Sequence, residues 1–133
     1  AETEENIANV YADQGKYEEA LDRYRRTLEI KIRMFGNDHP DVAASYLNIG
    51  NVYEKQGKHE EALVQYQKAL QVFLAVYGQD HLDVAATYNN IGLVYKEQGK
   101  YEEALVQYRR SLDIKIRVVG HSHPDVAKTE ENI

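Results

Sequence analysis

The chain has 133 residues, 43% of them hydrophobic and 29% charged, so it can bury a substantial core and is not composed like a disordered protein. Its net charge of −6 at pH 7 argues against a general nucleic-acid binder, which needs a basic surface. No apolar run approaches the roughly 20 residues of a membrane-spanning helix, and the N-terminus lacks the pattern of a signal peptide, so no membrane partner is expected.

The sequence repeats itself every 42 residues. GKYEEALDRY at 15–24 recurs as GKHEEALVQY at 57–66 and as GKYEEALVQY at 99–108, and AKTEENI at 127–133 repeats AETEENI at 1–7 with one change. Self-similarity at a fixed period is typical of arrays of small structural units. We therefore expect a single domain, 1–133, of three repeats (1–42, 43–84 and 85–126) followed by the start of a fourth at 127–133.

Each repeat is expected to form two helices, and no segment alternates with the two-residue period of a strand. In the middle repeat, apolar or small residues from Val42 to Tyr53 recur with the spacing of one buried helical face. Gly57 follows and should end this first helix, because glycine adopts a left-handed conformation without steric cost. A second apolar rhythm runs over 62–77 and stops at Gly78.

The junction between repeats carries signals for the start of the next helix. Asp80 or His81 is a candidate N-cap, and Asp83 would lie in the first turn, where the helix dipole favours negative charge. Pro40 and Pro124 occupy the same junction in the other repeats and suit a first-turn position.

A pattern of small and large residues recurs with the same spacing in the three repeats, although Glu4 of the first repeat stands where the others have Tyr46 and Tyr88. In the middle repeat it consists of Tyr46, Ile49, Gly50, Tyr53, Gly57, Ala62, Tyr66, Ala69 and Leu70. This pattern resembles the tetratricopeptide repeat family. The 42-residue period and the junctions GNDHPDVA at 36–43 and GHSHPDVA at 120–127 are similar to the subtype found in kinesin light chains and nephrocystin-like proteins.

The resemblance implies an all-α solenoid, in which antiparallel helix pairs stack into a right-handed superhelix. It would contain three full repeats and a truncated seventh helix, and the first helix of each pair would line a concave groove. In the family, a small residue lies where the two helices of a pair cross, so Gly50 should face Ala62.

The second helix should be longer than in the family's common 34-residue unit. A proline usually ends the helix there, whereas this chain has Ile32 and helix-compatible residues at the same place in the other repeats. The helices should therefore run about two turns further, to Phe35, Tyr77 and Val119.

Other side chains of the second helix have simple structural explanations. Acid-before-base pairs at i, i+4, such as Asp22–Arg26 and Asp113–Arg117, should form ion pairs on its exposed face. Phe73 replaces the lysine of the other two repeats. Packing along the long helix explains Phe73 better than contact with a partner.

The resemblance also places candidate binding residues on the groove side of the first helices. They are Asn6, Asn9, Leu47, Asn48, Asn51, Lys55, Asn89, Asn90, Leu93 and Glu97. An asparagine amide both donates and accepts hydrogen bonds, so a row of them can pair with the backbone of an extended peptide. Alternatively, these asparagines are solvated or bond to the next repeat.

The charges of this surface indicate the kind of peptide. Acidic residues outnumber the lysines on the first helices, and Glu5 and Leu47 stand where chaperone-tail binders of the family hold a cationic carboxylate clamp. An acidic peptide would meet repulsion, so we expect a neutral or basic one.

We expect a protein–protein interaction scaffold that binds a peptide or helix of a partner in its groove. The alternative is a structural spacer or self-associating rod without a specific ligand, of natural or consensus-like designed origin. Because the chain starts and stops at nearly the same phase of the repeat, head-to-tail contacts between copies are expected.

No catalytic, cofactor or metal site is expected. The sequence has no serine–histidine–acid arrangement and no phosphate-binding loop. His39, His81 and His123 recur once per repeat, about 10 Å apart, which is too far for shared coordination. The absence of cysteine excludes thiolate ligands and is compatible with a cytoplasmic protein. Since the first residue is not methionine, we also expect the chain to come from a longer protein.

Overall fold

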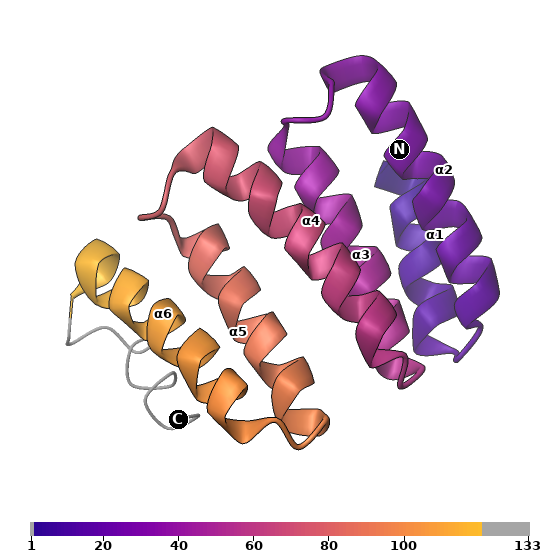
Figure 1. Ribbon diagram of the computed structural model, residues 1–133. Coiled ribbons are helices and arrows are strands. Elements are labelled where there is room, and N and C mark those ends of the chain that lie inside the picture. Colours follow the sequence, from indigo (N-terminus) through magenta and orange to yellow (C-terminus); the bar gives the residue numbers. More distant parts are fainter. Residues whose placement is uncertain (1, 121–133) are drawn as a thin grey trace. The chain divides into compact units, whose positions relative to one another are not determined.

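A computed structural model describes residues 2–120, and these form six helices and no strand (Figure 1). The helices are α1 (Glu2–Asp13), α2 (Tyr17–Phe35), α3 (Pro40–Lys55), α4 (His59–Tyr77), α5 (Leu82–Glu97) and α6 (Tyr101–Val119). Within this part of the chain, no helix is both long and apolar enough to cross a membrane. The expected all-α class is confirmed, whereas the expected seventh helix lies outside the described residues.

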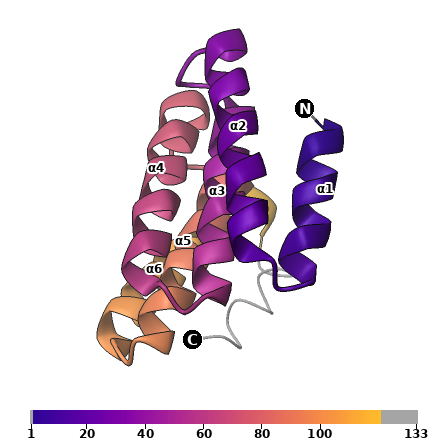
Figure 2. The same cartoon turned by 90° about the vertical axis from the view of Figure 1, so that its right-hand side faces the viewer.

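The chain divides into two compact units, and the boundary between Val72 and Phe73 falls inside α4. Helices α1, α2 and α3 and most of α4 belong to the first unit. The end of α4 and helices α5 and α6 belong to the second. Two views show α1 and α2 as neighbouring helices joined by a short turn (Figure 1 and Figure 2). The division of the chain into one domain of 42-residue repeats stays a prediction.

The second helices end where the sequence predicts, at Phe35, Tyr77 and Val119. The extra length of each repeat is therefore helix and not loop. Gly57 has φ of 76° and its N–H donates to the carbonyl of Glu54 at 2.9 Å, which terminates α3. An L-residue other than glycine is strained in this left-handed conformation.

His81, and not Asp80, caps α5. Its Nδ1 atom accepts the backbone N–H of Asp83 at 3.0 Å, while the Asp80 carboxylate pairs with an arginine of α6. The imidazole stacks on the ring of Tyr77, with 3.7 Å between ring centroids. His39 makes the equivalent cap and an aromatic stack at the start of α3. The extended second helix thus supplies the aromatic surface on which the next helix's cap rests.

The first and second helices of a repeat approach closely at a glycine, where the nearest atoms belong to a tyrosine ring of the second helix. A Cβ atom on Gly50 would lie 2.7 Å from the ring of Tyr66, which is a closer approach than to any other atom. A Cβ atom on Gly92 would lie 2.9 Å from the ring of Tyr108 and 3.3 Å from the carbonyl oxygen of Ala104. Ala104 is the equivalent of Ala62, so the glycine does face the small residue of the second helix there. The tyrosine ring therefore limits the size of the residue at this crossing.

Phe73 is buried, which confirms that it is a packing residue. In the first unit the core is continuous across three helices, because side chains of α1, α2 and α3 pack together. Its buried members are Ala8, Ala12, Ala20, Leu21, Tyr24, Ile49 and Val52. This shared core holds the exposed faces of α1 and α3 in fixed positions.

Candidate functional site

Two adjoining clefts lie between α1 and α3 in the first unit. The first, here called the shelf cleft, has a volume of about 380 Å³. It is lined by Glu5, Asn6, Asn9, Lys31, Met34, Phe35, Asp41 and Ala44. The second, here called the amide cleft, has a volume of about 300 Å³. It is lined by Asn9, Ala12, Asp13, Tyr24, Asn48, Asn51, Val52 and Lys55. The two clefts meet at Asn9, which lines both, and they are together called the groove here.

Five of the residues singled out in the sequence come together in this groove. They are Asn6, Asn9, Asn48, Asn51 and Lys55. Leu47 belongs to α3 but lines neither cleft. The remaining four candidates lie on α5, in the second unit: Asn89, Asn90, Leu93 and Glu97.

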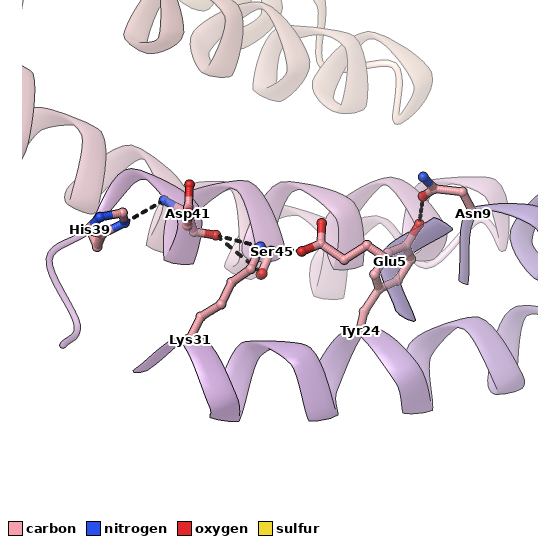
Figure 3. A network of polar contacts seen from close by, with 7 residues as sticks. All are labelled: Glu5, Asn9, Tyr24, Lys31, His39, Asp41 and Ser45. Carbon is pink, nitrogen blue, oxygen red and sulfur yellow. Dashed lines mark hydrogen bonds and ion pairs between the residues drawn. The ribbon is translucent and has the colours of Figure 1, made fainter. Parts of the chain in front are cut away.

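A tyrosine of the second helix fixes the amide of an asparagine on the first. The hydroxyl of Tyr24 donates to Oδ1 of Asn9, and the hydroxyl of Tyr66 lies 2.5 Å from Oδ1 of Asn51 and 3.0 Å from the carboxylate of Glu54, so its single proton is shared between these two acceptors. Figure 3 shows Tyr24 rising from α2 towards Asn9. Since the side-chain oxygen is directed at the tyrosine, the NH₂ group of each asparagine is left to donate elsewhere. In the third repeat Leu93 occupies the equivalent position, so this arrangement is confined to the first two repeats.

The environment of Tyr24 keeps its hydroxyl a donor. Burial, with the negative charges of Glu5 and Asp13, raises the pKa of Tyr24 above its ordinary value of 10.0. The phenol therefore stays protonated through the neutral pH range and continues to orient Asn9.

Two further groove asparagines, Asn6 and Asn48, have no side-chain hydrogen-bond partner among residues 4–120, whose side chains the structure describes. Asn89 is half-buried, and its side-chain oxygen is likewise unpaired within the described part of the chain. An unsatisfied amide can bond either to water or to a ligand. The groove of the first unit thus offers both oriented and unengaged amide groups.

Lys31 is a residue of the groove that the sequence did not identify. It comes from α2, where it is buried, and its Nζ atom forms an ion pair with the Glu5 carboxylate and lies 3.4 Å from the carbonyl oxygen of Asp41 (Figure 3). The resemblance to the family places groove residues on the first helix of each repeat, whereas Lys31 lies on a second helix. The available signal was that Lys31 and Phe73 occupy the same repeat position, where a lysine and a phenylalanine have opposite chemistry.

The charges of the groove are largely compensated within it. Lys31 is paired with Glu5, and Lys55 of α3 lies 3.7 Å from Asp13 of α1. Both pairs link neighbouring helices. Neither lysine is therefore an uncompensated cation that would attract an acidic ligand.

The chain matches a family model described as tetratricopeptide repeat over residues 1–75, 41–117 and 83–133. These three overlapping segments together span the whole chain. The search of curated proteins gives no match.

Solved structures with similar folds include BtubC (BKLC) from P. vanneervenii, at 27% identity and a TM-score of 0.86. That match covers 97% of this chain and 52% of BtubC. A kinesin light chain-like protein from Podosopora anserina with nearly identical TPR-like repeats matches at 18% identity and a TM-score of 0.82, covering 98% of this chain and 62% of its own. The chain thus spans about half to three-fifths of the length of these structures.

Proposed function

Since this chain belongs to the tetratricopeptide repeat family, we propose that the groove of its first unit binds an extended peptide segment of a partner protein. Proteins of this family generally mediate protein–protein interaction or scaffolding, and their fold is a non-enzymatic type. A cytoplasmic location stays a prediction.

The observation that supports this proposal is the set of amides along the groove. Asn9 and Asn51 are each oriented by a tyrosine, and Asn6 and Asn48 are unengaged within the described residues. An extended peptide presents carbonyl and N–H groups along both edges of its backbone, and all of them need partners when water is excluded. Amide side chains satisfy both kinds of group, so the groove suits a peptide backbone.

The oriented asparagines are pre-organised hydrogen-bond donors. Because Tyr24 occupies the oxygen of Asn9, and Tyr66 lies against that of Asn51 while also reaching Glu54, Asn9 above all should donate its N–H groups to peptide carbonyls. Their rotamers are already restricted in the free protein, which lowers the entropic cost of binding. Asn48 should be the more adaptable contact.

A selection of random dodecapeptides displayed on phage, against the immobilised chain, tests this proposal. The affinity of each recovered peptide is then measured by fluorescence anisotropy with the native chain and with Asn48→Ala. Loss of one hydrogen bond should weaken binding about threefold to tenfold. Asn37→Ala, in the exposed loop between α2 and α3, is the matched control and should leave the affinity unchanged. Peptides that bind Asn48→Ala and Asn9→Ala as tightly as the native chain would contradict the proposal.

One observation favours a second function, self-association through the end of the array. Ile30 on α2 is 43% exposed, whereas the equivalent residues Val72 and Ile114 are 6% and 3% exposed. The position is therefore one that repeats normally cover. A second copy of the chain, stacked on this face of α2, would bury Ile30.

Sedimentation velocity at increasing concentration tests self-association. The weight-average mass of the native chain should rise with concentration, and Ile30→Ser should reduce the rise. Val64→Ser removes an equally exposed valine from α4 and should have no such effect. A native chain that stays monomeric at millimolar concentration would rule out this second function.

A further inference from the structure

The shelf cleft has an exposed apolar wall. Met34 and Phe35, in the last turn of α2, are 66% and 42% exposed although both side chains are apolar. Both residues belong to the extension of α2 beyond Ile32. Covering this surface releases water and is favourable. The extra turns of the long repeat therefore add an apolar surface to the groove.

Asp41 also lines the shelf cleft, and its carboxylate is exposed. The backbone of Asp41 is fully used, because its N–H donates to His39 and its carbonyl accepts from Ser45 and Lys31. Its carboxylate has no ion pair or hydrogen bond within residues 4–120. The backbone contacts hold the side chain at the mouth of the cleft, where a cation can reach it.

The other charges of the shelf cleft cancel. Lys31 and Glu5 form an ion pair at its floor, so Asp41 carries the uncompensated charge among the residues that line it. A ligand group with negative charge would be repelled, and a neutral group would leave the carboxylate unpaired. A positive group is complementary.

We propose that the shelf cleft binds a lysine or arginine side chain of the peptide, with its aliphatic stem on Met34 and Phe35 and its charged group at Asp41. Basic side chains combine an apolar stem with a charged end, which matches this wall and this carboxylate. This inference rests on the proposed function, because it names the residue that a groove-bound peptide places in one of the two clefts.

Asp41 also lies in the first turn of α3, so its role in binding must be separated from its role in the helix. Asp83 occupies the same position in α5 and its N–H is held by His81 in the same way. Asp83→Asn therefore removes the same favourable interaction with a helix dipole as Asp41→Asn does. It serves as the matched control.

The experiment uses the phage-displayed dodecapeptides recovered on the native full-length chain. Those whose binding is weakened by Asn48→Ala should be enriched in arginine or lysine at one position. Replacing that residue of the peptide by glutamine should weaken binding to the native chain about threefold to fivefold, as expected for an exposed ion pair. The same replacement should have no effect with Asp41→Asn, and the full effect with Asp83→Asn. Met34→Ala should weaken binding of the basic peptide, and circular dichroism should show that every variant is folded.

Two results would overturn the inference while leaving the proposed function intact. The first is that peptides dependent on Asn48 carry no enriched basic residue. The second is that the glutamine replacement weakens binding to Asp41→Asn as much as to the native chain. If every recovered peptide binds Asn48→Ala and Asn9→Ala as tightly as the native chain, the proposed function itself fails and this inference fails with it.

Discussion

Replacing Glu5 and Lys31 by leucine and phenylalanine tests what the ion pair at the floor of the groove contributes to stability. These are the residues that the second repeat carries at the equivalent positions, Leu47 and Phe73. The side chains of Lys31 and Glu5 are 9% and 20% exposed. Water is therefore largely excluded from both charges, and each depends on the other for compensation.

The two single substitutions should be unequal. Glu5→Leu leaves the more deeply buried ammonium of Lys31 without a partner and should lower the free energy of unfolding by about 3 kcal/mol. Lys31→Phe leaves a carboxylate that can turn towards water, so the loss should be smaller, about 2 kcal/mol. The double variant exchanges the pair for two apolar side chains and should lie within about 1 kcal/mol of the native chain.

Urea denaturation at pH 7, followed by circular dichroism, gives the three differences and their coupling. We expect the double variant to be more stable than either single variant; a loss of about 1 kcal/mol in the double variant corresponds to a coupling of about 4 kcal/mol. Additive losses, with the double variant destabilised by about 5 kcal/mol, would show that the two side chains stabilise the fold independently. That result would refute the ion-pair interpretation.

Three further substitutions test the fold and the groove. Burial and the charges of Glu5 and Asp13 raise the pKa of Tyr24, so its contribution to stability should be complete below pH about 10 and lost as pH rises through the folded-state pKa. In urea denaturation at alkaline pH, the free energy of unfolding of Tyr24→Phe should therefore fall less steeply with pH than that of the native chain. Equal slopes would contradict a raised pKa at Tyr24. Gly57→Ala should lower the free energy of unfolding by about 1 kcal/mol through backbone strain alone, since no atom lies within 4 Å of the added methyl group; an unchanged melting temperature would be the contrary result. His81→Ala should lower the free energy of unfolding by about 1 kcal/mol by removing the cap of α5, and His81→Asn, which can still cap the helix, should lower it much less. Equal losses of stability in the two variants would mean that the ring stack, and not the cap, stabilises this junction.

Helix boundaries could be predicted from the sequence because they depend on local signals that recur every 42 residues. Ile32 stands where the common unit has a proline and so predicted the longer second helix, and Gly57 and Gly78 marked two helix ends. Each of these features acts on its own stretch of backbone, so knowledge of the rest of the fold was not needed.

The partners of the polar side chains could not be predicted in the same way. The i, i+4 rule identified Asp22–Arg26, which forms at 2.8 Å, but Arg117 pairs with Asp80 of the preceding junction instead of Asp113. An exposed ion pair contributes only a few tenths of a kcal/mol, so two possible partners of the same arginine differ little in free energy. Tertiary placement therefore decides among them.

In the groove, too, positions could be predicted from the sequence but contacts between helices could not. The asparagine row could be placed on the first helices from its spacing, and five members of the predicted set line the two clefts. That Tyr24 would orient Asn9, and that Lys31 would reach Glu5 from another helix, depends on how the helices cross. A repeat period gives equivalent positions and does not give contacts between helices.

The central claim, that the groove of the first unit binds a peptide, is tested most directly by NMR. A ¹⁵N-labelled sample of the full chain is titrated with one of the dodecapeptides recovered by phage display, and the side-chain NH₂ resonances are followed. The account predicts saturable shifts at Asn9, Asn48 and Asn51, with the exposed loop residue Asn37 unchanged. Shifts confined to residues around Val64 on α4, with the groove asparagines unmoved, would contradict it.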